Sequence, residues 1–330
     1  MSTLIVEVCE ITCVEKHPNA DALDILTIKG WQVVEKRGRH KVGESVVYFQ
    51  PDSILPKELS DKLNCTQYLA KQRVKPARLR GFVSCGLVGP NEGGWSVGTD
   101  LTEHYGITKY EPPEPSHHGG LGGQNAKEIG PFHHYTNIEN WNNWNRVLIE
   151  DEEVIITEKI HGTNWRAGLV DEEFYVGSHH KTKIKDEKIV YWEAALKYNI
   201  EEKMRKYLHG RCWVLFGEVF GKVQDLKYGL DGIDLRLFDA TKDGSYLDYD
   251  DFERLAEKLQ VPTVPLMYRG PYNAKTLAEL ATGSAFSGDH LKEGVVIRPV
   301  KERFHSKLHR VILKKINPEY LVRNKGTEYH

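Results

Sequence analysis

The stretch EKIHGTNWR at residues 158–166 determines how the rest of the chain is interpreted. It follows EVIIT at residues 153–157, a β-branched run with the composition of a buried strand. Lys159 therefore lies at a strand end, and Gly162 predicts a turn directly after it. Burial disfavours the charged form of a lysine, and a neutral lysine amine can attack phosphorus or carbonyl carbon. We predict that Lys159 is a nucleophile.

A plainer interpretation is that Lys159 extends from a strand end into solvent and that Gly162 only makes a turn. Four later segments favour the chemical interpretation. They are, in order, FGEVFG at 216–221, LRLFD at 235–239, EGVVIR at 293–298 and VILKK at 311–315. Together with residues 158–166 they resemble motifs I, III, IIIa, IV and V of the nucleotidyltransferases that include ATP-dependent ligases and capping enzymes. Their order and spacing, and the form KIHGTN, are similar to RNA ligases of the phage RNA ligase 2 group.

The resemblance implies a covalent Lys159–AMP intermediate formed from ATP. Glu218 and Glu293 would hold Mg²⁺ or Mn²⁺, because hard cations prefer carboxylate oxygens, and Glu218 would also contact the ribose. Phe238 would stack on adenine, although core packing is the alternative role for this ring. The other candidates for nucleotide binding are Glu158, Ile160, Gly162, Asn164, Arg166, Lys314 and Lys315.

Four positions in or after the motifs carry further expectations. Relatives often separate the two lysines of motif V by one residue, whereas Lys314 and Lys315 are adjacent and must face opposite sides of a strand. We expect Lys314 to contact the α-phosphate and to keep the Lys159 amine neutral by like-charge repulsion, and Lys315 to serve RNA binding or structure. His161 matches the RNA ligase form of motif I, whereas His179 stands where relatives often carry arginine.

The composition limits which classes of protein this chain can belong to. The chain has 330 residues, a net charge of −2, 28% charged and 40% hydrophobic residues, which suits an ordinary globular protein of two or three domains. Apolar runs fall far short of the roughly 18 residues of a membrane span, and no signal peptide is evident. The five cysteines are scattered along the chain, and we expect their thiols to be reduced. We therefore expect a cytoplasmic or otherwise intracellular monomer without a membrane partner.

Residues 1–110 predict an all-β domain, because short apolar runs alternate with Gly and Pro-Asn turns. HPNADAL at 17–23 and KVGE at 41–44 resemble the OB-fold of tRNA-binding domains attached to some aminoacyl-tRNA synthetases. They also resemble the N-terminal OB domain of RNA ligases of the Naegleria and Deinococcus type, as does VYFQPDS at 47–53. OB barrels follow a nucleic-acid strand with basic and aromatic side chains. The predicted RNA-binding residues are Lys36, Arg37, Arg39, Lys71, Arg73, Arg78 and Arg80.

Residues 111–130 are rich in Pro, Gly and His and predict a linker or mobile loop. We expect its His117 and His118, and His133 and His134 beyond it, to face solvent. Residues 131–330 then form the nucleotidyltransferase domain, an α+β, ATP-grasp-like ligase fold of antiparallel sheets and peripheral helices. Its predicted helices are 188–208, with a capping box formed by Asn199 and Glu202, then 250–259 and 276–281.

The sequence thus predicts an ATP-dependent RNA ligase that adenylylates a 5′-phosphate and seals it to a 3′-OH. Its partner would be nicked duplex or structured RNA, and the Naegleria and Deinococcus resemblance implies nicks with an RNA 3′-OH, as in RNA repair. One alternative is a DNA ligase or capping-type nucleotidyltransferase, whose OB domain follows motif V. Only 16 residues follow Lys314 here, and the OB-like part is at the front. The other alternative is a non-catalytic tRNA-binding OB protein, which leaves the five ordered motifs unexplained.

Overall fold

The computed structural model of the chain describes residues 3–111 and 123–323. Backbone contacts divide the described residues into two units. The first contains residues 3–111 with the short segments 138–145 and 316–323. The second contains residues 123–137 and 146–315, and therefore all five motifs up to Lys315.

The first unit is built on a five-stranded antiparallel sheet in the order β3-β2-β1-β4-β8. Its strands are β1 (Glu7–Lys16), β2 (Leu23–Ile28), β3 (Trp31–Lys36), β4 (Ser45–Phe49) and β8 (Leu87–Pro90). Val6, Val8, Val47 and Phe49 are buried in its core. The all-β architecture predicted for this part of the chain is confirmed.

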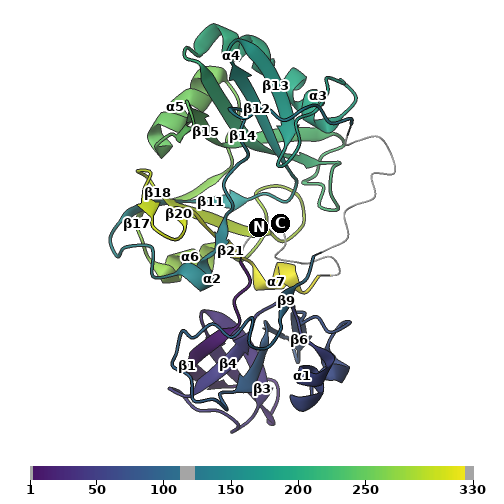
Figure 1. Ribbon diagram of the computed structural model, residues 1–330, viewed down its shortest axis with the longest axis vertical. Helices are drawn as coiled ribbons and strands as arrows, with labels where there is room; N and C mark the ends of the chain where they lie inside the picture. The colour runs from purple at the N-terminus through teal and green to yellow at the C-terminus, as the bar shows by residue number, and fades with distance from the viewer. Residues whose placement is uncertain (1–2, 112–122, 324–330) are drawn as a thin grey trace. The chain divides into compact units, whose positions relative to one another are not determined.

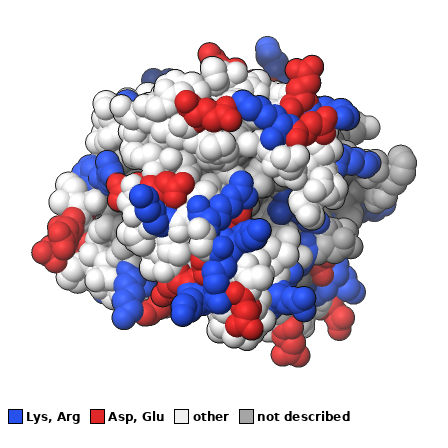
Figure 2. All heavy atoms as spheres, turned by 90° about the horizontal axis from the view of Figure 1, so that it is seen from below, with Lys and Arg blue, Asp and Glu red and all other residues white. Residues whose placement is uncertain are grey.

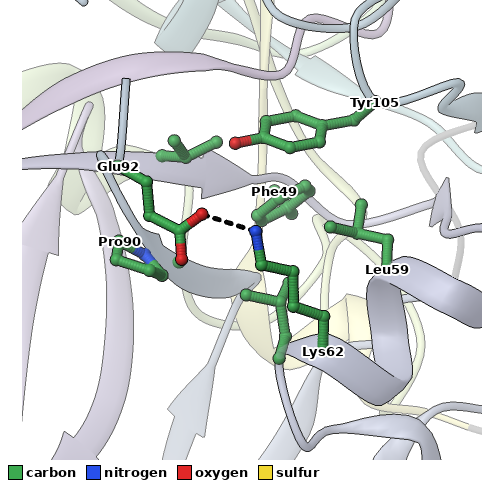
Figure 3. A pocket seen from close by; sticks show the side chains of 9 residues that line it. Phe49, Leu59, Lys62, Pro90, Glu92 and Tyr105 are labelled. Carbon is green, nitrogen blue, oxygen red and sulfur yellow. Dashed lines mark hydrogen bonds and ion pairs between the residues drawn. The ribbon is translucent and has the colours of Figure 1, made fainter. Parts of the chain in front are cut away.

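Smaller elements complete the first unit. These are β5 (Ser53–Ile54), α1 (Lys57–Lys62), the 3₁₀ turn η1 (Thr66–Tyr68), β6 (Ala77–Leu79), β7 (Phe82–Ser84), β9 (Thr108–Lys109), β10 (Glu139–Asn140), α2 (Trp141–Trp144) and α7 (Pro318–Leu321). A small pocket between α1 and β8 is lined by Phe49, Leu59 and Tyr105, and by the ion pair of Lys62 with Glu92 (Figure 3). No predicted site residue lines this pocket.

Two antiparallel sheets form the second unit. One contains four neighbouring strands in the order β21-β18-β11-β17, and the other has the order β13-β12-β14-β15-β16. Their bounds are β11 (Glu153–Lys159), β12 (Thr163–Val170), β13 (Glu173–Ser178), β14 (Cys212–Gly221), β15 (Ile233–Lys242), β16 (Ser245–Tyr246), β17 (Leu266–Pro271), β18 (Gly294–Pro299) and β21 (Leu313–Ile316). Residues 160–162 carry the chain from the first sheet into the second.

Helices cover one face of the second sheet (Figure 1). They are α3 (Val190–Lys197), α4 (Ile200–Tyr207) and α5 (Tyr249–Leu259). Along β15 the side chains alternate, so that Ile233, Leu235 and Leu237 enter the core beneath these helices. Asp234, Arg236 and Phe238 are only partly buried, as expected for the opposite face. This opposite face is the one that receives the motif residues.

The predicted helix at 188–208 is interrupted. Asn199 adopts a left-handed backbone with φ of 51°, which separates α3 from α4. Its side chain makes no capping hydrogen bond, so the predicted capping box with Glu202 is wrong. The helix predicted at 250–259 is confirmed as α5. The remaining elements are α6 (Ala274–Leu280), close to the predicted 276–281, and the hairpin of β19 (Phe304–His305) and β20 (His309–Arg310). Among the described residues, no helix is long and apolar enough to cross a membrane.

Candidate active site

Lys159 is the last residue of β11, where that strand pairs with the start of β18. The backbone register places Lys159 opposite Gly294, and Glu293 directly precedes Gly294. The Lys159 ammonium consequently forms an ion pair with the carboxylate of Glu293. The Lys159 side chain is only 16% exposed, so the plainer expectation of a lysine extending into solvent is not met. Motifs I and IV are thereby joined at one point.

A chain of polar contacts continues from Glu293. Nδ1 of His161 lies 3.4 Å from the Glu293 carboxylate, and Nε2 of the same ring lies 2.9 Å from Asp225. The backbone N–H of His161 donates to the hydroxyl of Tyr228 at 2.7 Å. The His161 ring is therefore fixed between two carboxylates, directly beside the Lys159–Glu293 pair.

The second sheet contributes Asn164, Glu218 and Phe238. Asn164 of β12 pairs with Glu218 of β14, and Glu218 pairs with Arg236 of β15, so these three side chains share one face. The register of β14 with β15 shifts between Phe216 and Gly217, because β15 has one extra residue there, Phe238. Oδ1 of Asn164 and Nε of Arg236 are buried without a hydrogen-bond partner among the described residues. Buried polar atoms of this kind are available to a bound molecule.

The turn at Gly162 brings the two sheets together. A Cβ atom at Gly162 would lie 2.2 Å from the carbonyl oxygen of Val219 and 3.0 Å from Cγ of Glu218. The backbone of motif I therefore lies directly against motif III. The carbonyl of Gly162 also accepts a hydrogen bond from Gln224 at 3.2 Å. Only glycine permits this approach.

We expect Gly162→Ala to disrupt this contact. Overpacking against a backbone carbonyl destabilises proteins by about 1 to 3 kcal/mol, and misplacing a reactive group by about 1 Å can cost about 100-fold in rate. Thermal unfolding and transfer of label from ATP to the protein would measure the two effects. Gly130→Ala is the matched control, because a Cβ there meets no atom within 4 Å. Equal stability and activity of the two variants would contradict the steric argument.

The two glutamates differ in their ionisation. Burial would raise the pKa of Glu293, but the Lys159 ammonium and the His161 ring outweigh that effect and hold the pKa at about 2. Burial raises the pKa of Glu218 to about 8; Lys159 opposes this rise, the charge of Glu293 adds to it, and the Gly162 N–H lowers it by hydrogen bonding. Glu293 is thus the ionised partner of Lys159, whereas burial disfavours the charged form of Glu218.

Phe238 packs against a small apolar cluster that contains the predicted nucleotide contact Ile160. The Phe238 ring is partly exposed, and the ring of Tyr135 meets it edge-on at 4.8 Å. The hydroxyl of Tyr135 donates a hydrogen bond to buried Asp239 at 2.8 Å. Asp239 also forms an ion pair with Arg310 at 2.7 Å. A buried ionic network therefore holds the aromatic group behind Phe238.

Removing the hydroxyl group tests this network. Tyr135→Phe is expected to destabilise the protein by about 1 to 3 kcal/mol, because buried Asp239 loses a donor and Arg310 loses an acceptor at 3.1 Å. Urea unfolding would measure the change. The control is Tyr68→Phe, whose ring is 82% exposed and whose loss of a hydroxyl should change the unfolding free energy by less than about 0.5 kcal/mol. A stable Tyr135→Phe protein would show that the hydroxyl group is dispensable.

Glu158 and the two motif V lysines are all buried. The Glu158 carboxylate accepts the N–H of Phe286 at 3.0 Å, and burial raises its pKa, opposed by that hydrogen bond and by Lys292. Lys314 and Lys315 on β21 are 2% and 7% exposed. Because both are buried, their exposure does not distinguish between them. The assignment of Lys314 to the α-phosphate stays a prediction.

Arg166 lies where its guanidinium serves the fold. It is fully buried, donates to the carbonyl of Ser178 at 3.0 Å, pairs with Glu128 at 3.1 Å and lies over the Phe132 ring at 4.2 Å. These contacts bind the segment before motif I to β12 and β13. They argue against the predicted direct contact of Arg166 with the nucleotide.

The histidines outside motif I differ in their environment. His133 is half-buried, its Nε2 lies 2.9 Å from the Thr241 hydroxyl, and burial lowers its pKa. The prediction that His133 faces solvent is therefore wrong, whereas His134 is exposed. His117 and His118 lie outside the described residues. Burial lowers the pKa of His179 to about 4, with the neighbouring His180 adding to the shift, so this ring is neutral near pH 7.

Several of the predicted RNA-binding residues of the first unit already have acidic partners. Arg73 pairs with buried Asp52 at 2.5 Å and lies 3.7 Å over the Tyr110 ring. The other ion pairs are Arg37–Asp24, Arg39–Glu35 and Arg78–Glu319. Lys36, Lys71 and Arg80 are exposed and form no ion pair among the described residues. Figure 2 likewise shows basic side chains interleaved with acidic ones on one face of the molecule.

Glu293 and Glu218 offer the oxygen ligands that Mg²⁺ and Mn²⁺ take. Among the described residues, no three His, Cys, Asp or Glu side chains are grouped so as to hold a metal ion by themselves. Mg²⁺ is commonly bound by one or two carboxylates together with substrate phosphates, so two carboxylates fit that mode. The donor set suits a metal ion that arrives with a nucleotide.

Four residues of this site were not predicted. Asp225, Gln224 and Tyr228 come from the loop after β14, and Arg236 lies opposite Glu218. The loop residues contact motif I across more than 60 positions of sequence. Arg236 could have been predicted from the sequence, because it lies two residues before Phe238 on the same strand and so has its side chain on the same face. The loop contacts carry no comparable sequence signal.

Comparison with protein families agrees with this geometry. Residues 152–316, half of the chain, match the family model described as RNA ligase. The chain belongs to the RNA ligase family. Residues 5–91 of this ligase match an OB-fold domain model, in agreement with the fold of the first unit. The predicted family, ligase activity and fold class are thus confirmed. The alternative of a non-catalytic OB protein does not account for the match over the motifs.

Solved structures of an RNA ligase from Naegleria gruberi have the same fold. An apo form of that enzyme carrying a point mutation matches with a TM-score of 0.79 and 24% identity, covering 99% of this ligase and 100% of that chain. A mutant with ATP and Mn gives the same TM-score and identity over 98% and 100%. A structure with PPi gives a TM-score of 0.77 at 24% identity, over the same shares of the two chains. No curated protein matches this ligase.

Proposed function

We propose that this ligase is ATP-dependent and stores AMP on Lys159 before it joins RNA ends. The observation that carries the proposal is the position of Lys159 between motifs: it ends β11, pairs with Glu293 and adjoins the Gly162 turn that contacts motif III. A nucleophilic lysine needs an acceptor placed in line with it, and the approach of the two sheets at the Gly162 turn beside Lys159 supports this proposal. The related Naegleria ligase with ATP and Mn supports the choice of nucleotide.

In the first step the Nζ atom of Lys159 attacks the α-phosphorus of ATP. The nitrogen–phosphorus bond forms, the bond to the bridging oxygen breaks, and pyrophosphate leaves with the electron pair. Attack requires the neutral amine, so the Lys159–Glu293 pair must separate and a proton must leave the ammonium group. Phe238 would stack on adenine, Glu218 would contact the ribose, and Lys314 would neutralise the α-phosphate.

Glu218 and Glu293 would hold Mg²⁺ or Mn²⁺, which when bound neutralises charge on the triphosphate. In the second step an oxygen of the RNA 5′-phosphate attacks the AMP phosphorus, and the bond to Lys159 breaks. In the third step a 3′-OH attacks that 5′-phosphate and AMP leaves. Phosphoryl-type transfers depend mainly on positioning and electrostatic stabilisation, which these residues would supply.

Two labels of ATP test the first step. Protein freed of any bound AMP is incubated with ATP labelled at the α- or the γ-phosphate, with Mg²⁺ or Mn²⁺, and then precipitated in acid. The α-label should stay on the protein, and the γ-label should leave with pyrophosphate. If neither label is retained in the presence of either metal, the proposal is wrong.

We propose nicked duplex RNA as the substrate and an RNA 3′-OH as the preferred acceptor. This rests on the resemblance to ligases of the Naegleria and Deinococcus type. The experiment compares nicked duplexes that differ only in RNA or DNA on the 3′-OH side. Faster sealing with the RNA 3′-OH is expected, and equal sealing of both nicks would refute the preference.

A further inference from the structure

The β19–β20 hairpin, residues 304–310, lies in the chain between Glu293 and Lys314. Phe304 at its start is 71% exposed, the most exposed large apolar side chain of the second unit among the described residues. Its ring faces that of His309 at 5.8 Å. A single exposed apolar residue is common on protein surfaces. Here the neighbouring residues indicate that Phe304 is part of a binding surface.

The base of the hairpin is held firmly. Arg303, just before it, donates to Glu152 at 2.7 Å and to the Val147 carbonyl at 2.8 Å. Arg310, at its end, pairs with Asp239 at 2.7 Å and with Glu302 at 2.6 Å. At the tip, Nδ1 of His305 accepts the N–H groups of residues 307 and 308, both at 3.3 Å. Phe304 is thus presented on an ordered support.

The charged residues of the hairpin itself are all basic. From Arg303 to Lys315 the chain contains no acidic residue and five basic ones. Arg303 and Arg310 are neutralised by their partners, and Lys314 and Lys315 are buried. Lys307 at the tip is exposed and forms no ion pair among the described residues. The hairpin therefore displays an exposed aromatic ring at its base and, among the described residues, an unpaired cation at its tip.

We propose that this hairpin binds the RNA of the ligation reaction, with Phe304 stacking on an unpaired or terminal base and Lys307 contacting a phosphate. An exposed aromatic ring and a cation on one hairpin suit a nucleic-acid strand, because every base has a flat π-face and every nucleotide a negative charge. A second copy of the chain fits less well, since one ring and one lysine fall short of the roughly 1,000 Å² that a stable interface buries. The inference rests on the proposed function, and its test separates the two.

The test measures RNA binding apart from AMP transfer. The probe is a nicked RNA duplex whose 5′ end already carries AMP, so that Lys159 is not needed for sealing. Phe304→Ala should bind this duplex about tenfold more weakly than wild type, and Phe304→Trp should restore binding. Lys307→Gln should lower the slope of log affinity against log salt by about 1. Labelling of Lys159 from α-labelled ATP should be unchanged in all three variants.

The matched control is Leu196→Ala on α3, where a 41% exposed apolar side chain lies on the helical side of the unit. It should bind the duplex as wild type does. The inference is wrong if Phe304→Ala binds equally well, or if the variant changes the oligomeric state and leaves RNA affinity unchanged. Failure of the wild type to label would instead remove the proposed function.

Discussion

Lys159→Arg is expected to abolish transfer of AMP to the protein while leaving its fold intact. The guanidinium group stays protonated and can keep the ion pair with Glu293, but it offers no nucleophilic amine. The loss should be at least about 10⁴-fold in rate, as for other enzymes deprived of their nucleophile. Incorporation of α-labelled AMP into precipitated protein would measure the loss, and thermal unfolding would verify the fold.

Two companion variants separate chemistry from structure. Lys159→Ala should lose labelling equally but also destabilise the protein by about 3 kcal/mol, because it leaves the Glu293 carboxylate buried without its cation. Lys275→Ala removes an 85% exposed lysine on α6 and should leave labelling and stability unchanged. Labelling of Lys159→Arg at the wild-type rate would mean that another residue accepts AMP.

Glu293→Gln is expected to lower AMP transfer by about 10²- to 10³-fold, the effect of losing one electrostatic contact to a reacting centre. The substitution keeps the shape of the side chain but removes the charge that pairs with Lys159 and faces His161. A metal ion at Glu293 would also lose a ligand, so the Mn²⁺ concentration needed for half-maximal labelling should rise. Labelling rates across a series of Mn²⁺ concentrations would separate the two effects.

The control for Glu293→Gln is Glu257→Gln, an exposed position on the outer side of α5. Glu218→Gln should reduce labelling as well, because its carboxylate shares the site with Lys159 and Glu293. Both replacements keep the shape of the side chain, and circular dichroism would verify that each variant is folded. If Glu293→Gln labels at the wild-type rate at every Mn²⁺ concentration, its assigned role is wrong.

The parts of the fold that follow from local periodicity could be predicted from the sequence. β11 was expected from its β-branched run and is found at Glu153–Lys159, and the apolar stripe of α5 placed that helix within one residue. The break at Asn199 could not be predicted in this way. Ile200 and Met204 fit one helical repeat with the residues before them, and only the left-handed backbone at Asn199 interrupts it.

The same distinction between local patterns and long-range contacts applies to the candidate active site. Lys159, Glu218 and Glu293 belong to ordered motifs, and the structure brings them together through β-pairing and their mutual electrostatics. Asp225 contacts His161 through a loop whose path no local pattern records. Arg166 shows what a motif position does not record: the sequence predicts a nucleotide contact there, and the structure adds buried contacts with Ser178 and Glu128.

The passage of the chain from one sheet to the other at residues 160–162 has a kinetic consequence. The amine and Glu293 are attached to one sheet, whereas Glu218 and Phe238 are attached to the other. If a nucleotide is bound by residues of the second sheet, its distance from the Lys159 amine changes whenever the two sheets move about that junction. Backbone hydrogen bonds from Leu237 to Pro262 at 2.9 Å and from Val264 to Leu237 at 2.8 Å tie β15 to the segment leading into β17. Loosening that tie would slow bond formation without altering any atom that touches the reactants.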